Sequence, residues 1–220
     1  MSSRNINQSL KSIKESFFIN LTSRKDRLFH FKKNVKFNIS RFNAFNASSS
    51  NEGGTLTHSE KACFRSHYEL WMHILDTYSR GNFLIMEDDI NFIDNFIPEW
   101  NQNIYKFIPK NFNIIYLGGC LHENLSKYKF VLDPYNKYFN RIKKNIFFST
   151  DQQFWHMTSC CYLVNIKSLR ILVSEYLKFR NIMPVDEFLI KSINKFDCKS
   201  LYHTNPLLCF STMSDSDIKR

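Results

Sequence analysis

The sequence predicts an α/β domain with a largely parallel central sheet and helices packed against it. Short apolar runs of strand length alternate along the chain with longer segments whose apolar residues recur at helical spacing. No internal repeat is visible, and 220 residues suffice for one domain with a substantial core. Strands that alternate with helices usually pair in parallel, because each crossover helix returns the chain to the same edge of the sheet.

The first half of the chain begins with two predicted strands around one predicted helix. Residues 1–15 are polar and are expected to precede the domain, and the apolar run 16–21 predicts its first, buried strand. The charged segment 22–34 predicts a loop that leads into a helix, and a second strand is expected within 38–42. Serine, asparagine and glycine over 48–54 indicate a loop.

A capping box marks the start of the next helix. Thr57 and Glu60 fit the T-x-x-E pattern, in which the hydroxyl and the carboxylate each accept a hydrogen bond from a backbone amide at the helix start. Gly81 is expected to end this helix. One face of the helix is expected to carry Cys63, His67, Leu70, Trp71, Ile74 and Tyr78, which recur at helical spacing.

The second half of the chain continues this alternation. Pro184 suits the first turn of a helix, and the acidic residues that follow it complement the helix dipole. Residues 120–150 are basic and aromatic and show no clear period. The remaining predictions are strands over 82–86, 113–117 and 155–164, helices over 92–107, 166–179 and 184–196, and an extended segment over 199–210 that Pro206 interrupts.

The net charge narrows the classes of partner. Thirty Lys and Arg against 20 Asp and Glu give a net charge of +10, which favours nucleic acid, a phosphorylated sugar donor or an anionic membrane surface as partner. A bias toward AT-rich codons would produce the same excess of lysine without any function. With only 5 Gly and 5 Pro but 22 Phe, the chain is neither collagen-like nor disordered.

The six cysteines and the N-terminal segment predict a location. No C-x-x-C pair occurs, and Cys160 and Cys161 are adjacent, so the pattern fits neither a zinc site nor a disulfide scaffold. The cysteines are expected to be buried in a reducing compartment. Neither a signal peptide nor an 18-residue apolar stretch is visible. The chain is therefore expected in the cytoplasm, where its basic charge could hold it peripherally on an anionic membrane.

Charged residues gather where predicted strands end, which is the edge at which open α/β sheets bind ligands. Arg24 and Arg27 follow the first strand, and their guanidinium groups suit the oxygens of a diphosphate; a solvated basic loop is the alternative. Glu87, Asp88 and Asp89 follow a later strand and repel one another. A hard divalent cation, Mg²⁺ or Mn²⁺, would neutralise these carboxylates.

Strand alternation refines the expectation for this acidic segment. It places Glu87 and Asp89 on one side, where they can share a metal ion, and turns Asp88 away. A hydrated acidic turn is the alternative. Asp186 lies at a predicted helix start, where it is either a charge–dipole stabiliser or, if it faces a cleft, a general base.

Two histidines are further candidates. His67 lies on the apolar stripe of its helix, where most histidines are packing residues, and His203 lies in a late extended segment from which it could reach a metal ion. The motifs of P-loop NTPases, Rossmann dehydrogenases, zincins, α/β-hydrolases, RNA-recognition domains and zinc fingers do not occur in the sequence.

Short motifs follow one another in a fixed order across residues 16–217. They are Phe18-Ile19-Asn20-Leu21 with Arg24 and Asp26-Arg27, Arg41-Phe42-Asn43-Ala44, Leu56-Thr57 through Glu60, Cys63, Ser66-His67 and Leu70-Trp71, Ile85-Met86-Glu87-Asp88-Asp89, Ile115-Tyr116-Leu117-Gly118, Tyr162-Leu163, Pro184-Val185-Asp186-Glu187-Phe188-Leu189, Pro206-Leu207-Leu208, and a tail motif at Ser214-Asp215 or Ser216-Asp217. Taken in order, these motifs resemble glycosyltransferase family 25, which includes bacterial lipooligosaccharide galactosyltransferases and collagen hydroxylysine galactosyltransferases. The motif over 184–189 looks closest to the collagen branch. Ala62 departs from the glycine usual before the cysteine of the family, and 120–150 match no part of its pattern.

The resemblance implies one catalytic domain over 16–217, with a GT-A-type, Rossmann-like fold that binds a nucleotide sugar and an acceptor-side insertion over 120–150. It implies inverting transfer of galactose or glucose from a UDP-hexose to a glycan, lipooligosaccharide or hydroxylysine-type acceptor, with Mn²⁺ or Mg²⁺ as cofactor. Asp186 is implied as the base, and Glu87 and Asp89 as metal ligands with His203 as an extra one. The resemblance assigns donor binding to Asn20, Leu21, Arg24, Arg27, Ser66, His67 and Asp88.

Two other classes of protein stay open. One is a glycosyltransferase-like binding protein without catalysis, which the intact acidic segment 87–89 disfavours. The other is a basic nucleic-acid-binding protein or nuclease, which no aromatic–basic module supports; nucleic acid is therefore not expected as the partner.

Overall fold

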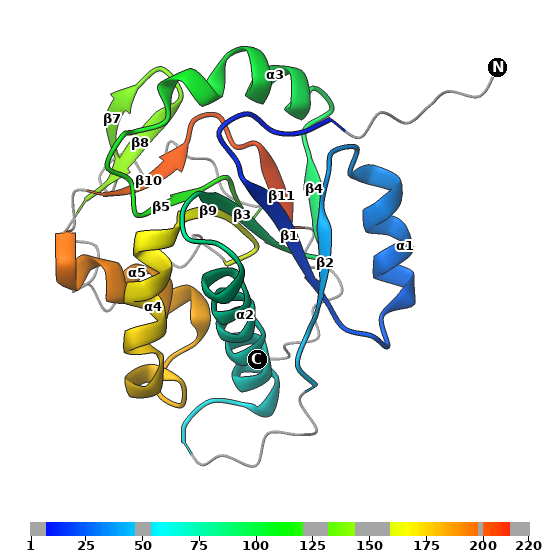
Figure 1. The fold of residues 1–220 in the computed structure, drawn as a ribbon, viewed down its shortest axis with the longest axis vertical. Helices are drawn as coiled ribbons and strands as arrows, with labels where there is room; N and C mark the ends of the chain where they lie inside the picture. Colours follow the sequence, from blue (N-terminus) through cyan, green and yellow to red (C-terminus); the bar gives the residue numbers. More distant parts are fainter. Residues whose placement is uncertain (1–7, 47–53, 121–131, 144–158, 198–199, 212–220) are drawn as a thin grey trace.

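The computed structural model describes residues 8–46, 54–120, 132–143, 159–197 and 200–211 (Figure 1). Within these ranges the chain forms three layers, with a large sheet in the middle and helices on both faces. The predicted tail motif after residue 211, most of the predicted loop over 48–54 and residues 155–158 of a predicted strand lie outside the described residues.

The central sheet has eight strands in the order β2-β1-β3-β9-β5-β10-β8-β7. Strands β9 and β8 run opposite to the other strands of this sheet. The sheet is therefore largely parallel in direction, as predicted, and is mixed in its pairing. Its strands are β1 (Glu15–Asn20), β2 (Ser40–Asn43), β3 (Asn82–Glu87), β5 (Ile114–Tyr116), β7 (Leu132–Asn136), β8 (Phe139–Ile142), β9 (Cys161–Asn165) and β10 (Leu201–Thr204).

A second, three-stranded sheet lies beside the first. It consists of β4 (Ile90–Phe92), β11 (Cys209–Ser211) and β6 (Gly118–Cys120). Strand β11 pairs antiparallel with β4 and parallel with β6. Since β4 directly follows the acidic segment at the end of β3, this small sheet brings the last described strand next to that segment.

The helices cover the sheet on both faces (Figure 1). Contacts within one core place α2, α4 and α5 on one face, and those of a second core place α1 and α3 on the other. The helical elements are α1 (Lys25–Asn34), α2 (His58–Thr77), α3 (Phe96–Gln102), the 3-10 helix η2 (Ile104–Phe107), α4 (Ile166–Phe179) and α5 (Val185–Asp197).

Strand β1 shows why the central strands read as continuous apolar runs. Phe17 and Ile19 point into the core under α2, whereas Phe18 points into the core under α1 and stacks on Phe31 with ring centroids 4.3 Å apart. A strand covered by helices on both faces needs apolar residues at every position, not at alternate ones. The same alternation recurs in β3, where Phe83 and Leu84 enter opposite cores.

The capping box at the start of α2 is confirmed. The Thr57 hydroxyl accepts from the Glu60 amide at 3.2 Å, and Glu60 Oε2 accepts from the Thr57 amide at 2.9 Å. The predicted end was wrong, because α2 ends at Thr77 and Gly81 lies in the turn that enters β3, with φ +135°. That turn leaves no room for a side chain, since a Cβ at Gly81 would lie 2.8 Å from Lys14 Cβ.

Two segments differ from their prediction. The helix expected over 92–107 is replaced by the end of β4, helix α3 and η2, because β11 pairs with residues 90–92. Within 120–150, where no period was visible, strands β7 and β8 form a hairpin on the outer edge of the sheet.

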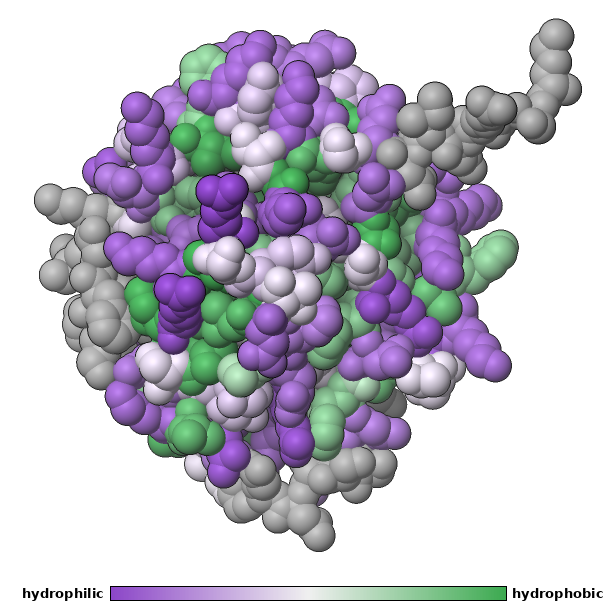
Figure 2. All heavy atoms as spheres, viewed as in Figure 1, coloured by the Kyte–Doolittle hydropathy of each residue, from purple (hydrophilic) through white to green (hydrophobic). Residues whose placement is uncertain are grey.

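Hydrophilic side chains cover most of the face shown in Figure 2, with smaller hydrophobic areas between them. None of the helices in the described ranges is long and apolar enough to cross a membrane.

Candidate functional site

A cavity of about 150 Å³ opens beyond the carboxyl ends of β1 and β3. The first half of α2 and the segment after β2 complete its wall. Ligands of open α/β sheets bind at this edge. Seven of the predicted site residues line the cavity: Leu21, Arg27, Ser66, His67, Glu87, Asp88 and Asp89.

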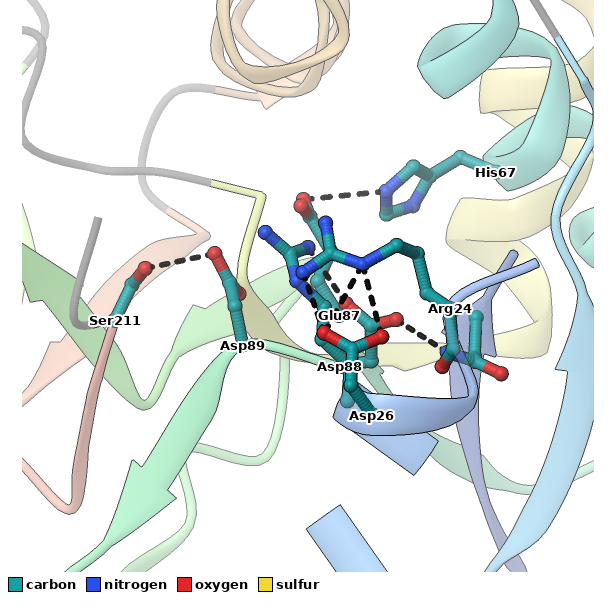
Figure 3. A network of polar contacts seen from close by, with 9 residues as sticks. Arg24, Asp26, His67, Glu87, Asp88, Asp89 and Ser211 are labelled. Carbon is teal, nitrogen blue, oxygen red and sulfur yellow. Dashed lines mark hydrogen bonds and ion pairs between the residues drawn. The ribbon is translucent and has the colours of Figure 1, made fainter. Parts of the chain in front are cut away.

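Asp88 joins the ends of β1 and β3 (Figure 3). Its Oδ1 accepts from Arg27 Nη1 at 3.0 Å, and its Oδ2 accepts from Asn20 Nδ2. The Asp88 side chain is only 9% exposed and that of Arg27 14%, so the ion pair is largely withdrawn from water. Burial raises the pKa of Asp88, and the contacts with Asn20 and Arg27 oppose that rise. Asp88 thus holds Arg27 in the cavity wall.

Arg24 lies apart from this pair. Its guanidinium binds Asp26, with Nη2 2.8 Å from Oδ2, and the Asp26 side chain is 62% exposed. The hydrogen bond from Arg24 lowers the pKa of Asp26 to about 2. Neither Arg24 nor Asn20 is among the residues that line the cavity. Two predicted donor-binding residues therefore lie outside the lining: Asn20 is buried and donates to the Arg24 carbonyl at 3.2 Å, and the Arg24 side chain faces the exposed Asp26.

Glu87 ends β3 and is held through one oxygen. Ser159 donates to Oε1 at 2.6 Å. His67 Nε2 lies 3.6 Å from the same oxygen, the contact that Figure 3 marks between these two side chains. Burial raises the pKa of Glu87, but His67 and Ser159 outweigh it, and the net pKa lies below the usual value. Glu87 is therefore an ionised carboxylate at the cavity.

Two buried side chains behind the cavity form a chain of contacts with His67. Trp71 Nε1 donates to the Tyr162 hydroxyl oxygen at 2.8 Å, and that oxygen lies 2.9 Å from His67 Nδ1. In the tautomer in which the Tyr162 hydroxyl donates to Nδ1, the imidazole proton lies on Nε2, on the side of Glu87. Nε2 is buried and has no hydrogen-bond partner among the described residues.

One carboxylate oxygen of Asp89 has no hydrogen-bond partner among the described residues. Ser211 donates to its Oδ2 at 3.0 Å, while Oδ1 is buried and has no hydrogen-bond partner among the described residues. Burial, and then the neighbouring charge of Glu87, raise the pKa of Asp89 to about 6. A buried carboxylate without a partner is costly, and a bound cation would remove that cost.

The donor set at this cavity fits a hard divalent cation. Asp89 Oδ1 and Glu87 supply carboxylate oxygens, the ligands that Mg²⁺ and Mn²⁺ prefer. A softer group lies nearby, since ligand atoms of Cys63, His67 and Glu87 fall within 4.8 Å of one another. Burial and surrounding carboxylates hold the pKa of the Cys63 thiol well above its usual value, so the thiol stays protonated. That group is therefore the poorer metal site.

His203, a predicted extra metal ligand, is buried in β10, outside the set of residues that line the cavity. Its Nδ1 lies 2.8 Å from the Thr204 carbonyl oxygen, and its ring also contacts the Gly118 backbone. Burial lowers its pKa. The structure therefore does not bring His203 together with Glu87 and Asp89 at the cavity lining.

Two other predicted residues have defined places. Ser66 donates to the Ala62 carbonyl and accepts from the Phe45 amide, each at 2.7 Å, so its hydroxyl ties α2 to the segment after β2. Asp186 lies in the first turn of α5, where Oδ1 accepts from the Glu187 amide at 3.0 Å. Its charge helps to raise the pKa of Cys63, a cavity residue. Asp186 thus lies on the α5 side of the cavity, outside its lining.

Four residues that hold the site were not predicted for that role. Ser159 lies in the turn before β9 and Ser211 ends β11, and no sequence motif marks them. Trp71 and Tyr162 stood in predicted elements, and their hydrogen bond could not be read from spacing. Only the fold brings these side chains to the acidic segment.

The family model for "Glycosyltransferase family 25 (LPS biosynthesis protein)" matches residues 13–189. A mimivirus protein from Acanthamoeba polyphaga mimivirus, "Procollagen lysyl hydroxylase and glycosyltransferase", is 25% identical over 202 residues, which is 81% of this chain and 20% of that protein. "Procollagen galactosyltransferase 1" of Danio rerio is 28% identical over 147 residues, 65% of this chain and 22% of that protein. "Procollagen galactosyltransferase 2" of Homo sapiens is 26% identical over 225 residues, 90% of this chain and 33% of that protein. This chain thus spans between a fifth and a third of the length of these relatives.

A solved structure supports the fold. A glycosyltransferase involved in the glycosylation of the major capsid of PBCV-1 superimposes with a TM-score of 0.52 at 11% identity, over 92% of this chain and 93% of that one. This likeness concerns the fold alone and confirms the expected GT-A-type α/β architecture. Since the family model covers residues 13–189, which is most of the sequence, the chain belongs to glycosyltransferase family 25.

Proposed function

We propose that this chain is a metal-dependent, inverting hexosyltransferase that moves galactose or glucose from a UDP-sugar to an acceptor hydroxyl. The observation that carries the proposal is Asp89 Oδ1, a buried oxygen without a partner among the described residues, beside ionised Glu87 in a cavity at the sheet edge. The names of the curated relatives support galactose and a hydroxylysine-type acceptor, and the description of the family model supports a lipopolysaccharide acceptor.

Glu87 and Asp89 would hold the metal ion, which supplies Lewis-acid neutralisation of the departing diphosphate. Arg27, fixed by Asp88 at 3.0 Å, adds a positive charge to the same wall. His67 Nε2 lies 3.6 Å from the Glu87 carboxylate and has no hydrogen-bond partner among the described residues, so it can serve as a further donor in this region. The metal ion, Arg27 and His67 would each stabilise the negative charge that grows on the diphosphate as the sugar–phosphate bond breaks.

Asp186 is the proposed base. Inversion needs one carboxylate on the acceptor side to take the proton of the attacking hydroxyl. Asp186 lies at the start of α5, half-buried and close enough to Cys63 to affect its pKa. The proposed base therefore lies at the start of α5, whereas the proposed metal ligands lie at the end of β3.

The test is UDP release from UDP-galactose and UDP-glucose with Mn²⁺, in the presence and absence of peptidyl hydroxylysine and lipooligosaccharide acceptors. Asp89→Asn should lower the rate on the order of 100-fold or more, because Lewis-acid assistance is worth several kcal/mol. Asp26→Asn is the matched control, since Asp26 is an exposed acid outside the cavity. Donor binding without turnover would contradict the proposal and fit a binding protein instead.

A further inference from the structure

A second cavity, of about 550 Å³, lies at the other end of the central sheet. The end of η2 with the segment that follows it, the β7–β8 hairpin and β10 line it. The order of strands separates this hairpin from β1 and β3, where the first cavity opens (Figure 1). Asn136 Nδ2 donates to the Phe107 carbonyl at 2.9 Å, which joins the hairpin to the opposite wall.

The lining of this second cavity is positively charged. It includes Lys106, Lys110 and Arg141, and it includes neither aspartate nor glutamate among the described residues. A concave site of one charge sign concentrates ligands of the opposite sign. Its volume falls within the range of small-molecule sites, about 300–1,000 Å³.

Arg141 is the central cation of this cavity. Its guanidinium carbon lies 5.1 Å from the ring centre of Tyr135 and 5.9 Å from that of Tyr202, and the two rings meet edge to face at 5.0 Å. These rings fix the guanidinium by cation–π attraction, which adds no hydrogen-bond acceptor. Arg141 is half-buried, and its Nε is buried with no hydrogen-bond partner among the described residues.

The acid opposite Arg141 is engaged elsewhere. Asp133 is its cross-strand neighbour in the hairpin, but the Asp133 carboxylate pairs with Lys143 at 3.1 Å. A desolvated guanidinium donor without an acceptor costs free energy, so a site that keeps one is built for an acceptor that arrives with a ligand.

We propose that this second cavity binds the anionic group of a sugar, either a carboxylate or a phosphate. The planar guanidinium of Arg141 can donate two parallel hydrogen bonds to such a group. Tyr135, which is 43% exposed, offers apolar ring surface to the rest of the sugar, and Lys106 and Lys110 add charge at the rim. A cavity of this volume favours a single sugar unit over a nucleic acid, which needs an extended basic track. The observations behind this site do not involve the proposed transfer reaction.

Binding is tested on the full chain with glucuronate, glucose 6-phosphate, glucose and inorganic phosphate, by calorimetry and by amide chemical shifts in NMR titrations. We expect saturable binding of one or both anionic sugars, shifts at the hairpin and β10, and no binding of glucose. The comparison of glucuronate with glucose 6-phosphate tells a carboxylate ligand from a phosphate ligand. Inorganic phosphate alone should bind more weakly, because it leaves the rings uncovered.

Arg141→Gln should weaken this binding about tenfold or more, because a hydrogen bond to a charged group is lost. Arg141→Lys keeps the positive charge but loses the planar guanidinium, so its affinity should lie between those of the parent protein and Arg141→Gln. Arg170→Gln removes an exposed charge on α4 and should leave the dissociation constant within about twofold. Melting temperatures of all variants establish that they fold.

Three results would overturn the proposal. The first is that neither anionic sugar binds, and the second is equal weakening by Arg141→Gln and Arg170→Gln, which indicates diffuse charge only. The third is tighter, steeply salt-dependent binding of a single-stranded oligonucleotide that Arg141→Gln abolishes, which indicates a nucleic-acid site. Loss of transfer activity at the first cavity would not affect any of these readouts.

Discussion

The hydroxyl oxygen of Tyr162 lies 2.9 Å from His67 Nδ1, and both side chains are fully buried. Trp71 donates to the same oxygen. In the tautomer in which the Tyr162 hydroxyl donates to Nδ1, the imidazole carries its own proton on Nε2, 3.6 Å from the Glu87 carboxylate. Trp71 and Tyr162 thus connect the core of the sheet, through His67, to a carboxylate at the cavity.

Tyr162→Phe should release His67 from this proton arrangement. Nitrogen-15 NMR of the His67 ring should show the Nε2-protonated form in the parent protein and a mixture of both tautomers in the variant. Affinity for Mn²⁺ should fall about 10- to 100-fold, as is usual when a group behind a metal ligand is removed. Tyr78→Phe is the control, since its hydroxyl has no hydrogen bond to a described residue. Unchanged ring shifts in Tyr162→Phe would refute the arrangement.

Much of the fold could be predicted because local physics and tertiary packing agree there. The apolar run that became β1 is buried on both faces, so its continuous pattern was informative. Thr57 and Glu60 stabilise their helix start through contacts three residues apart, which sequence spacing shows directly. The position of the acidic segment 87–89 could be predicted in the same way, because it directly follows the continuous apolar run that became β3.

The rest depended on contacts between distant residues. Ser211 reaches Asp89 across 122 positions of sequence, and His203 is fixed between strands that no local pattern pairs. Phe92 ends β4 only because β11 lies beside it. Hydrogen bonds of this kind arise from strand order, which residue spacing does not determine.

Arg27→Gln should destabilise the protein more than Arg24→Gln. Arg27 compensates Asp88, whose side chain is 9% exposed, whereas Arg24 pairs with Asp26, which is 62% exposed. Removing one partner of a buried pair leaves an uncompensated charge and costs about 3 kcal/mol, whereas an exposed pair contributes about 0–1 kcal/mol. Urea unfolding of both variants measures the difference. Equal losses would mean that water screens the Asp88 pair as well.

Asp89 should make the metal-free protein less stable as pH rises from about 4 through 6. Its pKa is raised from 3.8 to about 6 in the folded state, chiefly by burial, so the folded protein binds this proton more tightly than the unfolded chain. The free energy of unfolding then falls as the proton is lost. Asp89→Asn should match the parent protein near pH 4 and exceed its stability by about 2 kcal/mol at pH 7.5.

Bound Mn²⁺ should reverse this order of stability between the parent protein and Asp89→Asn. Mn²⁺ should raise the melting temperature of the parent protein at pH 7.5, with a smaller rise at pH 5, where Asp89 is mostly protonated. Asp89→Asn should show little rise at either pH. Asp26 provides a contrast of sign, since Arg24 lowers its pKa to about 2 and its contribution is lost only as pH falls toward that value. A parent protein whose stability rises between pH 4 and 6 relative to Asp89→Asn would contradict the assignment.

Gly118→Ala should loosen the small sheet beside the acidic segment. A Cβ at Gly118 would lie 2.5 Å from both the carbonyl oxygen and the Sγ of Cys209, its partner in β11, so the two strands must move apart. Overpacking of this kind usually costs about 1–3 kcal/mol. Because β11 also carries Ser211, the contact with Asp89 should weaken, and Mn²⁺ affinity should fall with stability.

A double-mutant cycle with Cys209→Ala separates the two contacts of the added methyl group. Cys209→Ala removes Sγ and leaves the carbonyl oxygen, so it should restore part, but not all, of the stability lost by Gly118→Ala. Urea unfolding and Mn²⁺ titration of the four proteins give both quantities. Full additivity of the two substitutions would show that the side-chain contact contributes nothing, and an unaltered Mn²⁺ affinity in Gly118→Ala would show that β11 does not position Asp89.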